Sequence, residues 1–347
     1  MARRVRSAHT ACMSPTIPIS AGERAASLPA TLRLGPVHLI VSDLDRSVAW
    51  YQRSLGLRVH EHEASTAALG DGIEPVLVLH EDPQANPAGR HAGLYHYALL
   101  YPTREELARA AIRLSETRTA IEGASDHGTH EAIYLPDPDG NGIELAADRP
   151  REQWPSPEEM YSHGPQALDF AALVATVAGE APSAQVGPGL RVGHLHLHVG
   201  DVDRGLAFYR DVIGFGVEAN LGSAAFVAAG GYHHHLGFNV WRGRGVGPAP
   251  AHTVGLEHWT VELEHAEEVD AVRARAEAAG VAVEPAGRGI LVRDPWVQLS
   301  GSTRPEERCW MRSSPTAAAA SRPSAMSWSV RSSMKPVSTA FAAQTPA

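Results

Sequence analysis

The sequence predicts a mixed α+β protein that contains two similar domains. The first observation is an internal repeat, in which residues 38–57 (HLIVSDLDRSVAWYQRSLGL) recur as residues 196–215 (HLHVGDVDRGLAFYRDVIGF) at an offset of 158. A weaker repeat relates residues 93–101 to residues 255–263 at an offset of 162. Within each copy, short strand-like runs alternate with helical patterns, which is typical of mixed α+β layers.

A chain of 347 residues is long enough for two domains that each bury a core. The connection between the copies is polar and contains Pro and Gly, and the end of the chain is rich in Ser, Ala and Pro. We therefore expect a disordered N-terminal extension (1–30), a first domain (33–150), a linker (151–188), a second domain (190–300) and a disordered or aberrant tail (301–347).

The first copy begins with a strand and a helix. Residues 36–42 alternate between apolar and polar side chains, as a half-buried strand does. Asp43 or Asp45 can cap the helix that follows, and Gly56 can end it. The apolar run at residues 75–80 (PVLVLH) predicts a further strand.

The second half of this copy follows the same plan. Residues 93–101 (GLYHYALLY) predict a strand, after which Thr103 and Glu106 form a capping box at the start of a helix. Residues 131–145 (EAIYLPDPDGNGIEL) predict two strands joined by a tight turn. Each domain is therefore expected to repeat the order strand, helix, strands.

Composition excludes several classes of function. Hydrophobic residues make up 44% and charged residues 20%, as in a soluble globular protein. The net charge of -9 comes without a basic stripe, so no nucleic-acid partner is expected, and no apolar run approaches the ~18 residues of a membrane span. The N-terminus lacks the apolar core of a signal peptide, and Cys12 and Cys309 cannot form a disulfide framework. A cytoplasmic protein is expected.

Three residues at equivalent points of the strands are candidate metal ligands. Each domain consists of two modules, each with the order strand, helix, strands. His38 lies on the first strand of the first module, His96 on the first strand of the second module, and Glu144 on the last strand of the second module. If these modules curve into one half-barrel, the three side chains converge, because alternate residues of a strand face the same side. Two imidazoles and one carboxylate are the facial set that holds Fe(II). A single strand His is more often a hydrogen-bonded core residue, but the shared position in the repeat favours the ligand interpretation.

The repeated D-x-D-R-x-x-A-aromatic-Tyr segments, the strand histidines and the DPDGNGIEL segment resemble the glyoxalase/bleomycin-resistance/extradiol-dioxygenase superfamily, the vicinal oxygen chelate (VOC) proteins. Residues 125–144 also resemble the extradiol signature, with His127, Tyr134 and Glu144 at its His, Tyr and Glu positions. Ser125 departs from the usual residue. Residues 232–241 (YHHHLGFNVW) resemble the compact CatE-like catechol 2,3-dioxygenases. The resemblance implies two VOC domains, each of paired βαβββ modules that form a curved half-barrel sheet.

The resemblance also implies a chemistry. An extradiol dioxygenase cleaves the ring of a catechol-type aromatic diol with Fe(II), or alternatively Mn(II), and O2. His127 and His80, which lies 16 residues before His96, compete for the role of acid/base, and Tyr134 matches the tyrosine that hydrogen-bonds the ligated hydroxyl. The structural alternatives are a surface-loop His and a packed strand Tyr. A homo-oligomer is expected.

The second domain departs from this pattern. His196 and His258 align with His38 and His96, but the final strand reads DPWVQLS, with Gln298 where Glu is expected. This favours a degenerate copy and one metal site per chain, in the N-terminal domain. The run His233–His235 cannot ligate one ion from a strand, because adjacent residues point to opposite faces, so we expect a loop that packs on the other domain or lines its pocket.

Two other functions stay open on the same fold. One is a glyoxalase-like, metal-dependent lyase or isomerase, although such enzymes usually draw four ligands across a module pair. The other is a non-catalytic small-molecule-binding protein, like the antibiotic-resistance members, which generally lack the metal triad.

Overall fold

The computed structural model describes residues 27–287, 289–296 and 325–330 of the chain. Four modules, each with the order βαβββ, contain most of these residues. Module 1 (33–81) comprises β1 (Arg33–Val41), α1 (Leu44–Trp50), η2 (Tyr51–Leu55), β2 (Arg58–His62), β3 (Thr66–Gly70) and β4 (Pro75–Glu81). Module 2 (93–148) comprises β5 (Gly93–Tyr101), α2 (Arg104–Glu116), β6 (Gly123–Asp126), β7 (His130–Pro136) and β8 (Gly142–Asp148).

The second copy repeats this order. Module 3 (191–239) comprises β10 (Arg191–His198), α5 (Val202–Leu206), η4 (Ala207–Ile213), β11 (Gly216–Asn220), β12 (Ala224–Ala228) and β13 (Leu236–Asn239). Module 4 (255–330) comprises β14 (Gly255–Leu263), α6 (Ala266–Ala278), β15 (Val283–Ala286), β16 (Gly289–Arg293) and β17 (Ala325–Val330). The predicted α+β class with repeated βαβββ modules is confirmed.

The connection between the copies contains η3 (Arg151–Gln153), α3 (Pro157–His163), β9 (Gln166–Ala167) and α4 (Phe170–Ala175). It is tied to the first copy by Arg113 on α2, a buried side chain that donates hydrogen bonds to the carbonyl oxygens of Leu55, Ser183 and Gln185. The predicted linker therefore packs against module 2 along part of its length.

Local sequence explains where the helices begin and end. Asp43 caps α1 by accepting a hydrogen bond from the Arg46 backbone N–H, and Asp201 caps α5 in the same way. Thr103 caps α2, as predicted. Gly56 ends η2 at a φ of 71°, a left-handed conformation that favours glycine.

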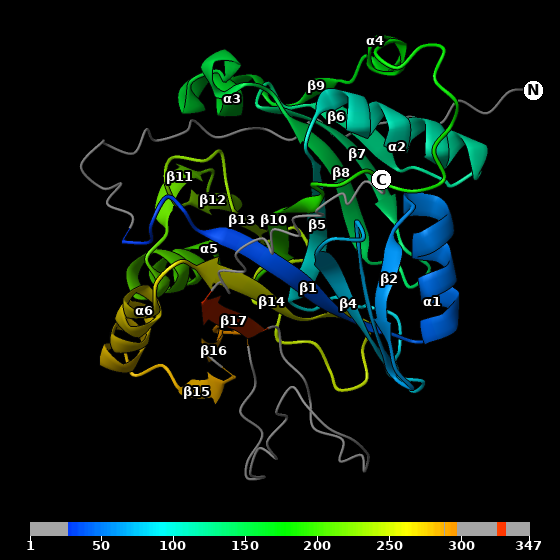
Figure 1. Ribbon diagram of the computed structural model, residues 1–347. Helices are drawn as coiled ribbons and strands as arrows, with labels where there is room; N and C mark the ends of the chain where they lie inside the picture. The colour runs from blue at the N-terminus through cyan, green and yellow to red at the C-terminus, as the bar shows by residue number, and fades with distance from the viewer. Residues whose placement is uncertain (1–26, 288, 297–324, 331–347) are drawn as a thin grey trace, which may run out of the picture.

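The modules pair across the two copies rather than within them. β1 is antiparallel to β14, with His38 opposite His258, and β5 is antiparallel to β10, with His96 opposite His196. Modules 1 and 4 thus form one half of a continuous sheet, the 1/4 half-barrel, and modules 2 and 3 form the other half, the 2/3 half-barrel (Figure 1). A short antiparallel pairing of β1 with β10, at Leu34 and Val192, joins the two halves. The premise that the strands of His38 and His96 lie side by side was wrong, because β1 pairs with β14 and β5 with β10, which joins residues 220 and 100 positions apart.

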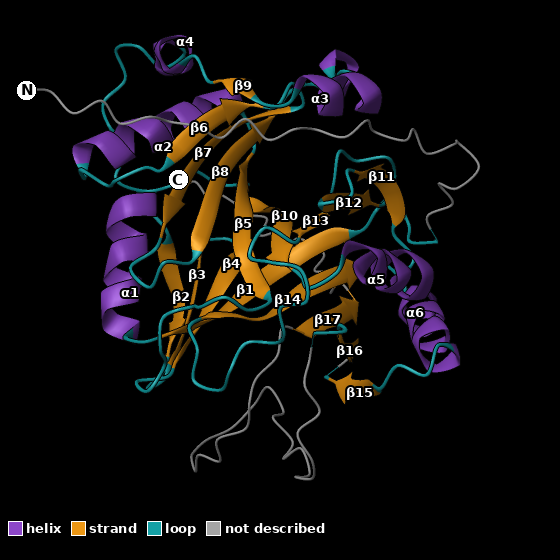
Figure 2. Cartoon of the chain, turned by 180° about the vertical axis from the view of Figure 1, so that it is seen from behind, coloured by secondary structure: helices purple, strands orange, loops and turns teal. Residues whose placement is uncertain are grey.

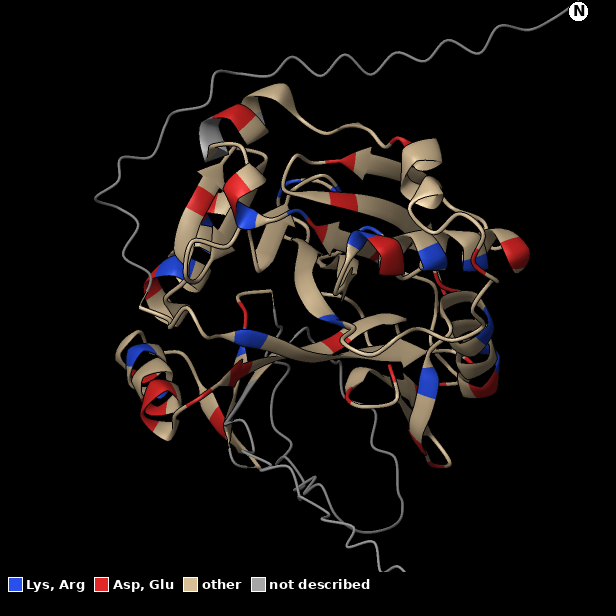
Figure 3. Cartoon of the chain, turned by 45° about the horizontal axis from the view of Figure 1, so that its top comes forward, with Lys and Arg blue, Asp and Glu red and all other residues tan. Residues whose placement is uncertain are grey.

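The helices cover the outside of the strands. α1 and α2 lie over modules 1 and 2, and α5 and α6 lie on the opposite side, next to modules 3 and 4 (Figure 2). Buried aromatic residues such as Tyr51, Tyr97 and Phe238 fill the space between these layers. Charged residues of both signs are spread over the helices, the strands and the loops (Figure 3). None of the helices in the described ranges is long and apolar enough to cross a membrane.

Both predicted disordered ends contain ordered residues. At the N-terminal end, Leu28 is buried and the backbone N–H groups of Ser27 and Leu28 donate to the Gly214 carbonyl oxygen. Within the predicted tail, β17 pairs parallel to β14 and antiparallel to β16. Its sequence AMSWSV alternates apolar and polar residues, a strand signal that the composition of the whole tail obscures. Gln298 lies outside the described residues.

Met326→Ala is expected to lower the free energy of unfolding by about 2–5 kcal/mol, since Met326 of β17 is only 2% exposed and its loss would leave a cavity. Ile73→Ala is the matched control, because Ile73 is 69% exposed and its truncation should change stability by less than about 0.5 kcal/mol. Urea unfolding of both variants measures the difference. Equal stabilities would show that β17 contributes nothing to the core.

Candidate metal centre

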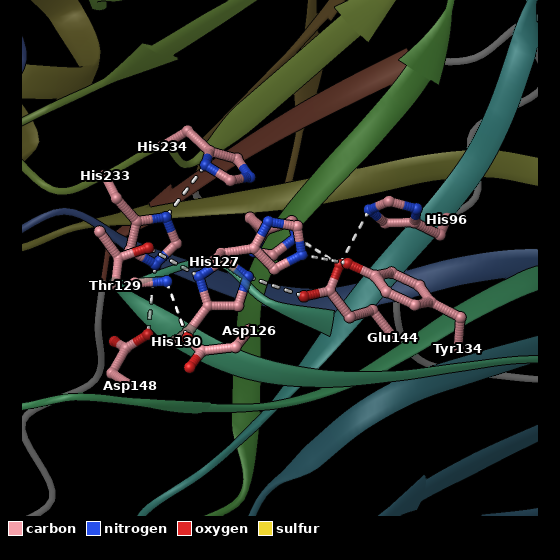
Figure 4. Close-up of polar contacts among 12 residues, drawn as sticks. His96, Asp126, His127, Thr129, His130, Tyr134, Glu144, Asp148, His233 and His234 are labelled. Carbon is pink, nitrogen blue, oxygen red and sulfur yellow. Dashed lines mark hydrogen bonds and ion pairs between the residues drawn. The ribbon is translucent and has the colours of Figure 1, made fainter. Parts of the chain in front are cut away.

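A carboxylate surrounded by histidines lies in the 2/3 half-barrel. Glu144 of β8 is buried, and its Oε2 lies 3.1 Å from His96 Nε2 and 3.1 Å from His194 Nε2. Its Oε1 lies 3.0 Å from His130 Nε2 (Figure 4). The ligand atoms of His96, Glu144 and His194 all lie within 4.8 Å of one another. This is a set of two imidazoles and one carboxylate.

Strand pairing explains why these side chains meet. In the parallel pairing of β5 with β8, Glu144 is opposite Ala98, two residues from His96 and therefore on the same face as His96. The antiparallel pairing of β5 with β10 has a register shift between Val192 and Leu195, which is where His194 lies. A bulge of this kind redirects a side chain. Three strands from two copies thus supply the three donors.

The electrostatics of the cluster favour the protonation states that a metal ion requires. Burial alone would raise the pKa of Glu144, but its interactions with His194, His130 and His96 outweigh burial and hold the pKa well below its usual range. Burial lowers the pKa of His194, although Glu144 opposes this. A charged carboxylate beside a neutral imidazole is the state in which both can ligate a cation.

The structure brings only part of the predicted ligand set together. His96 and Glu144 meet, but His38 lies in the 1/4 half-barrel, where its Nδ1 is 3.0 Å from His80 Nε2 and its ring stacks on His258 with centroids 3.8 Å apart. His194 takes the third place instead. His80, a predicted acid/base, is likewise remote from Glu144 and lies 3.1 Å from Glu257 Oε2. Pairing of modules across the copies is the physical reason for both differences.

The two residues chosen from the extradiol signature lie beside the cluster. His127 Nε2 is 2.7 Å from the Tyr134 hydroxyl, and the Tyr134 ring is 5.6 Å from the His96 ring. Burial, and next to it His130, lowers the pKa of His127 to about 4. Burial and the Glu144 carboxylate raise the pKa of Tyr134. At neutral pH His127 is therefore a neutral base beside a protonated phenol.

Several histidines at this centre were not selected from the sequence. His130, Asp148 and His233 have ligand atoms within 4.8 Å of one another, and the His130 and His233 rings stack with centroids 4.6 Å apart. The period of two in GHLHLH, which places His194 and His196 on one face, was an available signal for His194. His233 contacts the first copy through Asp148, at 3.2 Å, in agreement with the expected packing of His233–His235.

His130→Ala is expected to weaken metal binding about 10- to 100-fold without abolishing it, because His130 supports the ligand Glu144 from its other oxygen. An Fe(II) titration of the metal-free protein under anaerobic conditions measures the change. His62→Ala, which removes a half-exposed histidine of β2, should bind Fe(II) as the wild type does. Wild-type affinity in His130→Ala would argue against this supporting role.

Acid is expected to destabilise the fold through His235. Burial, followed by the effect of His194, lowers the pKa of His235 to about 3, and its Nδ1 accepts a hydrogen bond from the Ala229 backbone N–H. A histidine in the unfolded chain has a pKa of about 6.5, so the unfolded state takes up this proton first as pH falls. The stabilisation is complete above about pH 6.5 and is lost at about 1.4 kcal/mol per pH unit below it.

Between pH 7 and pH 5, His235→Asn should therefore lose about 2 kcal/mol less unfolding free energy than the wild type. Urea unfolding at the two pH values tests this, and identical losses would exclude His235 as a source of acid sensitivity.

Comparison with known proteins places this chain in a family. The model of the Glyoxalase/Bleomycin resistance protein/Dioxygenase superfamily matches residues 33–145 and 191–295. The chain is 41% identical over 275 residues to the catechol-2,3-dioxygenase of Bacillus subtilis (strain 168), covering 78% of this chain and 96% of that protein. The chain belongs to this superfamily, as the sequence predicted.

Two further likenesses are weaker. Biphenyl-2,3-diol 1,2-dioxygenase 3 of Rhodococcus globerulus is 29% identical over 145 residues, which cover 40% of this chain and 73% of that protein. The structure of glyoxalase I from Zea mays has a TM-score of 0.48 and 14% identity, covering 86% of this chain and 92% of that chain. The identity to the Bacillus protein supports the predicted class of enzyme, an oxidoreductase of the dioxygenase type.

Proposed function

We propose that the protein is an extradiol ring-cleaving dioxygenase that opens a catechol-type aromatic diol with O2, using Fe(II) held by His96, His194 and Glu144. The observation that carries this proposal is the three-donor cluster with the hydrogen-bonded pair His127–Tyr134 beside it. The dioxygenase relatives support the same reading.

The donor set fits Fe(II). Two imidazoles and one carboxylate on one side of an ion leave about three positions open, enough for two diol oxygens and O2. Glu144 is buried and charged, and it compensates part of the ion's charge. Mn(II) accepts the same donors and is the alternative ion. When bound, such an ion supplies a Lewis acid for the diol and a redox centre for O2.

The residues next to the centre position the substrate and its protons. With its pKa raised, Tyr134 stays protonated at neutral pH and can donate a hydrogen bond to a diol oxygen. His127 Nε2 lies 2.7 Å from the Tyr134 hydroxyl, and its ring is neutral. His127 can therefore accept a proton that the diol releases and return it later. Both oxygen atoms of O2 enter the ring-opened product, so no further reductant is required.

Aromatic side chains at the edge of the centre suit a flat substrate. Tyr95 is 40% exposed and lies with its ring 4.8 Å from His96, and Trp241 is 56% exposed and lies edge-on to Tyr95 at 5.5 Å. Offset or edge-on packing of such rings against an aromatic diol would exclude water from the reacting oxygens.

The test is O2 consumption by the full chain. The metal-free protein is loaded with Fe(II) anaerobically, its iron content is measured, and catechol or a substituted catechol is added with air. We expect O2 uptake together with a yellow product that absorbs in the near-visible range, and neither signal without O2. Protein that holds iron at Glu144, identified as the iron that Glu144→Gln fails to retain, and that consumes no O2 with any catechol would overturn the proposal.

A further inference from the structure

We infer that the 1/4 half-barrel holds a second divalent transition-metal ion, on His38, His80 and Glu257. The ligand atoms of these three residues lie within 4.8 Å of one another. This site is separate from the centre at Glu144 and does not depend on the proposed function. It also differs from the single site that the sequence predicted.

The contacts within this cluster are those of a compact donor set. His80 Nε2 lies 3.0 Å from His38 Nδ1 and 3.1 Å from Glu257 Oε2. His38 is buried, whereas the side chains of His80 and Glu257 are each 21% exposed, so an ion can reach them. The His258 ring stacks on His38, and its Nδ1 is 3.8 Å from Glu257 Oε2.

The strand registers show that the cluster occupies the position of the first centre within its own half-barrel. His38 is opposite His258 across β1 and β14, as His196 is opposite His96 across β10 and β5. His80 is opposite Ile40 in the parallel pairing of β4 with β1. Glu144 has the same relation to Ala98, since both Ile40 and Ala98 follow a first-strand histidine by two residues. His80 on the last strand of module 1 therefore occupies the same strand position as Glu144 on the last strand of module 2.

The carboxylate of the second cluster enters through a bulge. In the pairing of β1 with β14, the register shifts between His38 and Leu39, which leaves Glu257 without an opposite residue. In the pairing of β10 with β5, the register shifts in the same way between His196 and Leu197, which leaves Tyr95 without an opposite residue. A bulged residue can turn toward the face of its neighbour, and this is how Glu257 and His258 both reach His38.

The two half-barrels exchange the positions of their donors. In the 1/4 half-barrel, Pro36 is the residue that aligns with His194 in the repeat. Ser327, opposite Thr260, lies at the strand position that Glu144, opposite Ala98, has in the 2/3 half-barrel. The 1/4 half-barrel therefore lacks donors at these two positions. It has donors at two others instead, since His80 lies at the position of Asn239 and Glu257 at the position of Tyr95 in the 2/3 half-barrel. Each half-barrel consequently has two imidazoles and one carboxylate, a set that binds Zn(II), Fe(II) or Co(II).

The experiment counts ions with Co(II) as the probe. Metal-free full-length chain is titrated anaerobically with CoCl2, excess ion is removed, and cobalt per chain is measured together with the visible absorption of bound Co(II). We expect two ions in the wild type, one in Glu144→Gln, one in Glu257→Gln and none in the double variant. His62→Asn, a change of a histidine outside both clusters, should keep two.

The inference is overturned if the wild type binds one ion and Glu144→Gln binds none, or if Glu257→Gln leaves the count unchanged. An ion retained by the double variant would place the second site elsewhere and would also overturn it. Should Glu257→Gln not fold by circular dichroism, His80→Asn replaces it, since Asn is the residue that the other half-barrel tolerates at this position. Absence of ring cleavage would contradict only the proposed function, because the ion count at Glu257 does not involve catechol.

Discussion

Glu144→Gln should leave a folded protein that no longer retains Fe(II) at the centre of the 2/3 half-barrel. The change keeps the size of the side chain but removes the negative charge, and a neutral amide is a much poorer donor to a hard divalent ion. We expect the affinity for Fe(II) to fall at least about 10³-fold, or about 4 kcal/mol, and ring cleavage to be lost with it.

The measurement pairs iron content with O2 uptake. Glu116→Gln is the matched control, because Glu116 is an exposed carboxylate at the end of α2, and this variant should behave as the wild type does. His194→Ala should resemble Glu144→Gln, whereas His38→Ala should keep both iron at this centre and activity. If His38→Ala lost iron together with ring cleavage and His194→Ala kept both, the ligand set that we propose would be wrong.

Tyr134→Phe and His127→Asn should lower kcat by about 10²- to 10⁴-fold while the iron at Glu144 stays bound. Tyr134→Phe removes the hydroxyl that lies 2.7 Å from His127 Nε2, and His127→Asn removes the base itself. Neither residue is a proposed ligand, so the loss should appear in kcat rather than in the iron count. The pair should also be less than additive, because each residue acts through the other.

Tyr101→Phe is the control for this pair. Tyr101 lies on β5, the strand of His96, and its buried hydroxyl has no hydrogen-bond partner among the described residues. Loss of that hydroxyl should leave kcat unchanged. A variant Tyr134→Phe with wild-type kcat would show that the signature tyrosine takes no part in the reaction.

Much of the candidate site could be selected from the sequence. The signature residues His127, Tyr134 and Glu144 and the strand residue His96 all lie at one centre. They come from one continuous module, where the distance along the chain and the alternation of strands bring them together. His38 lies away from this centre because its strand belongs to another module, and the sequence pattern of β1 closely resembles that of β10.

His194 is a residue of the centre that the sequence alone could not select. It lies two residues before His196, and the strand alternation allows either residue to face the centre. A register shift between β10 and β5 turns His194 toward Glu144, while His196 Nε2 accepts a hydrogen bond from Asn239 at 2.9 Å. A bulge depends on the partner strand, so it has no signal in either strand alone.

The sequence by itself therefore predicted the repeated βαβββ modules, a cap at Asp43 or Asp45 for α1 and at Thr103 for α2, and four residues that the structure brings together. These features follow from interactions between residues close in the chain, namely capping, alternation and turn formation. Only the tertiary structure decided which modules share a half-barrel, and with it the separation of His38 from His96. Strands with equivalent edges can pair in more than one way, and the packing of the whole chain selects one arrangement.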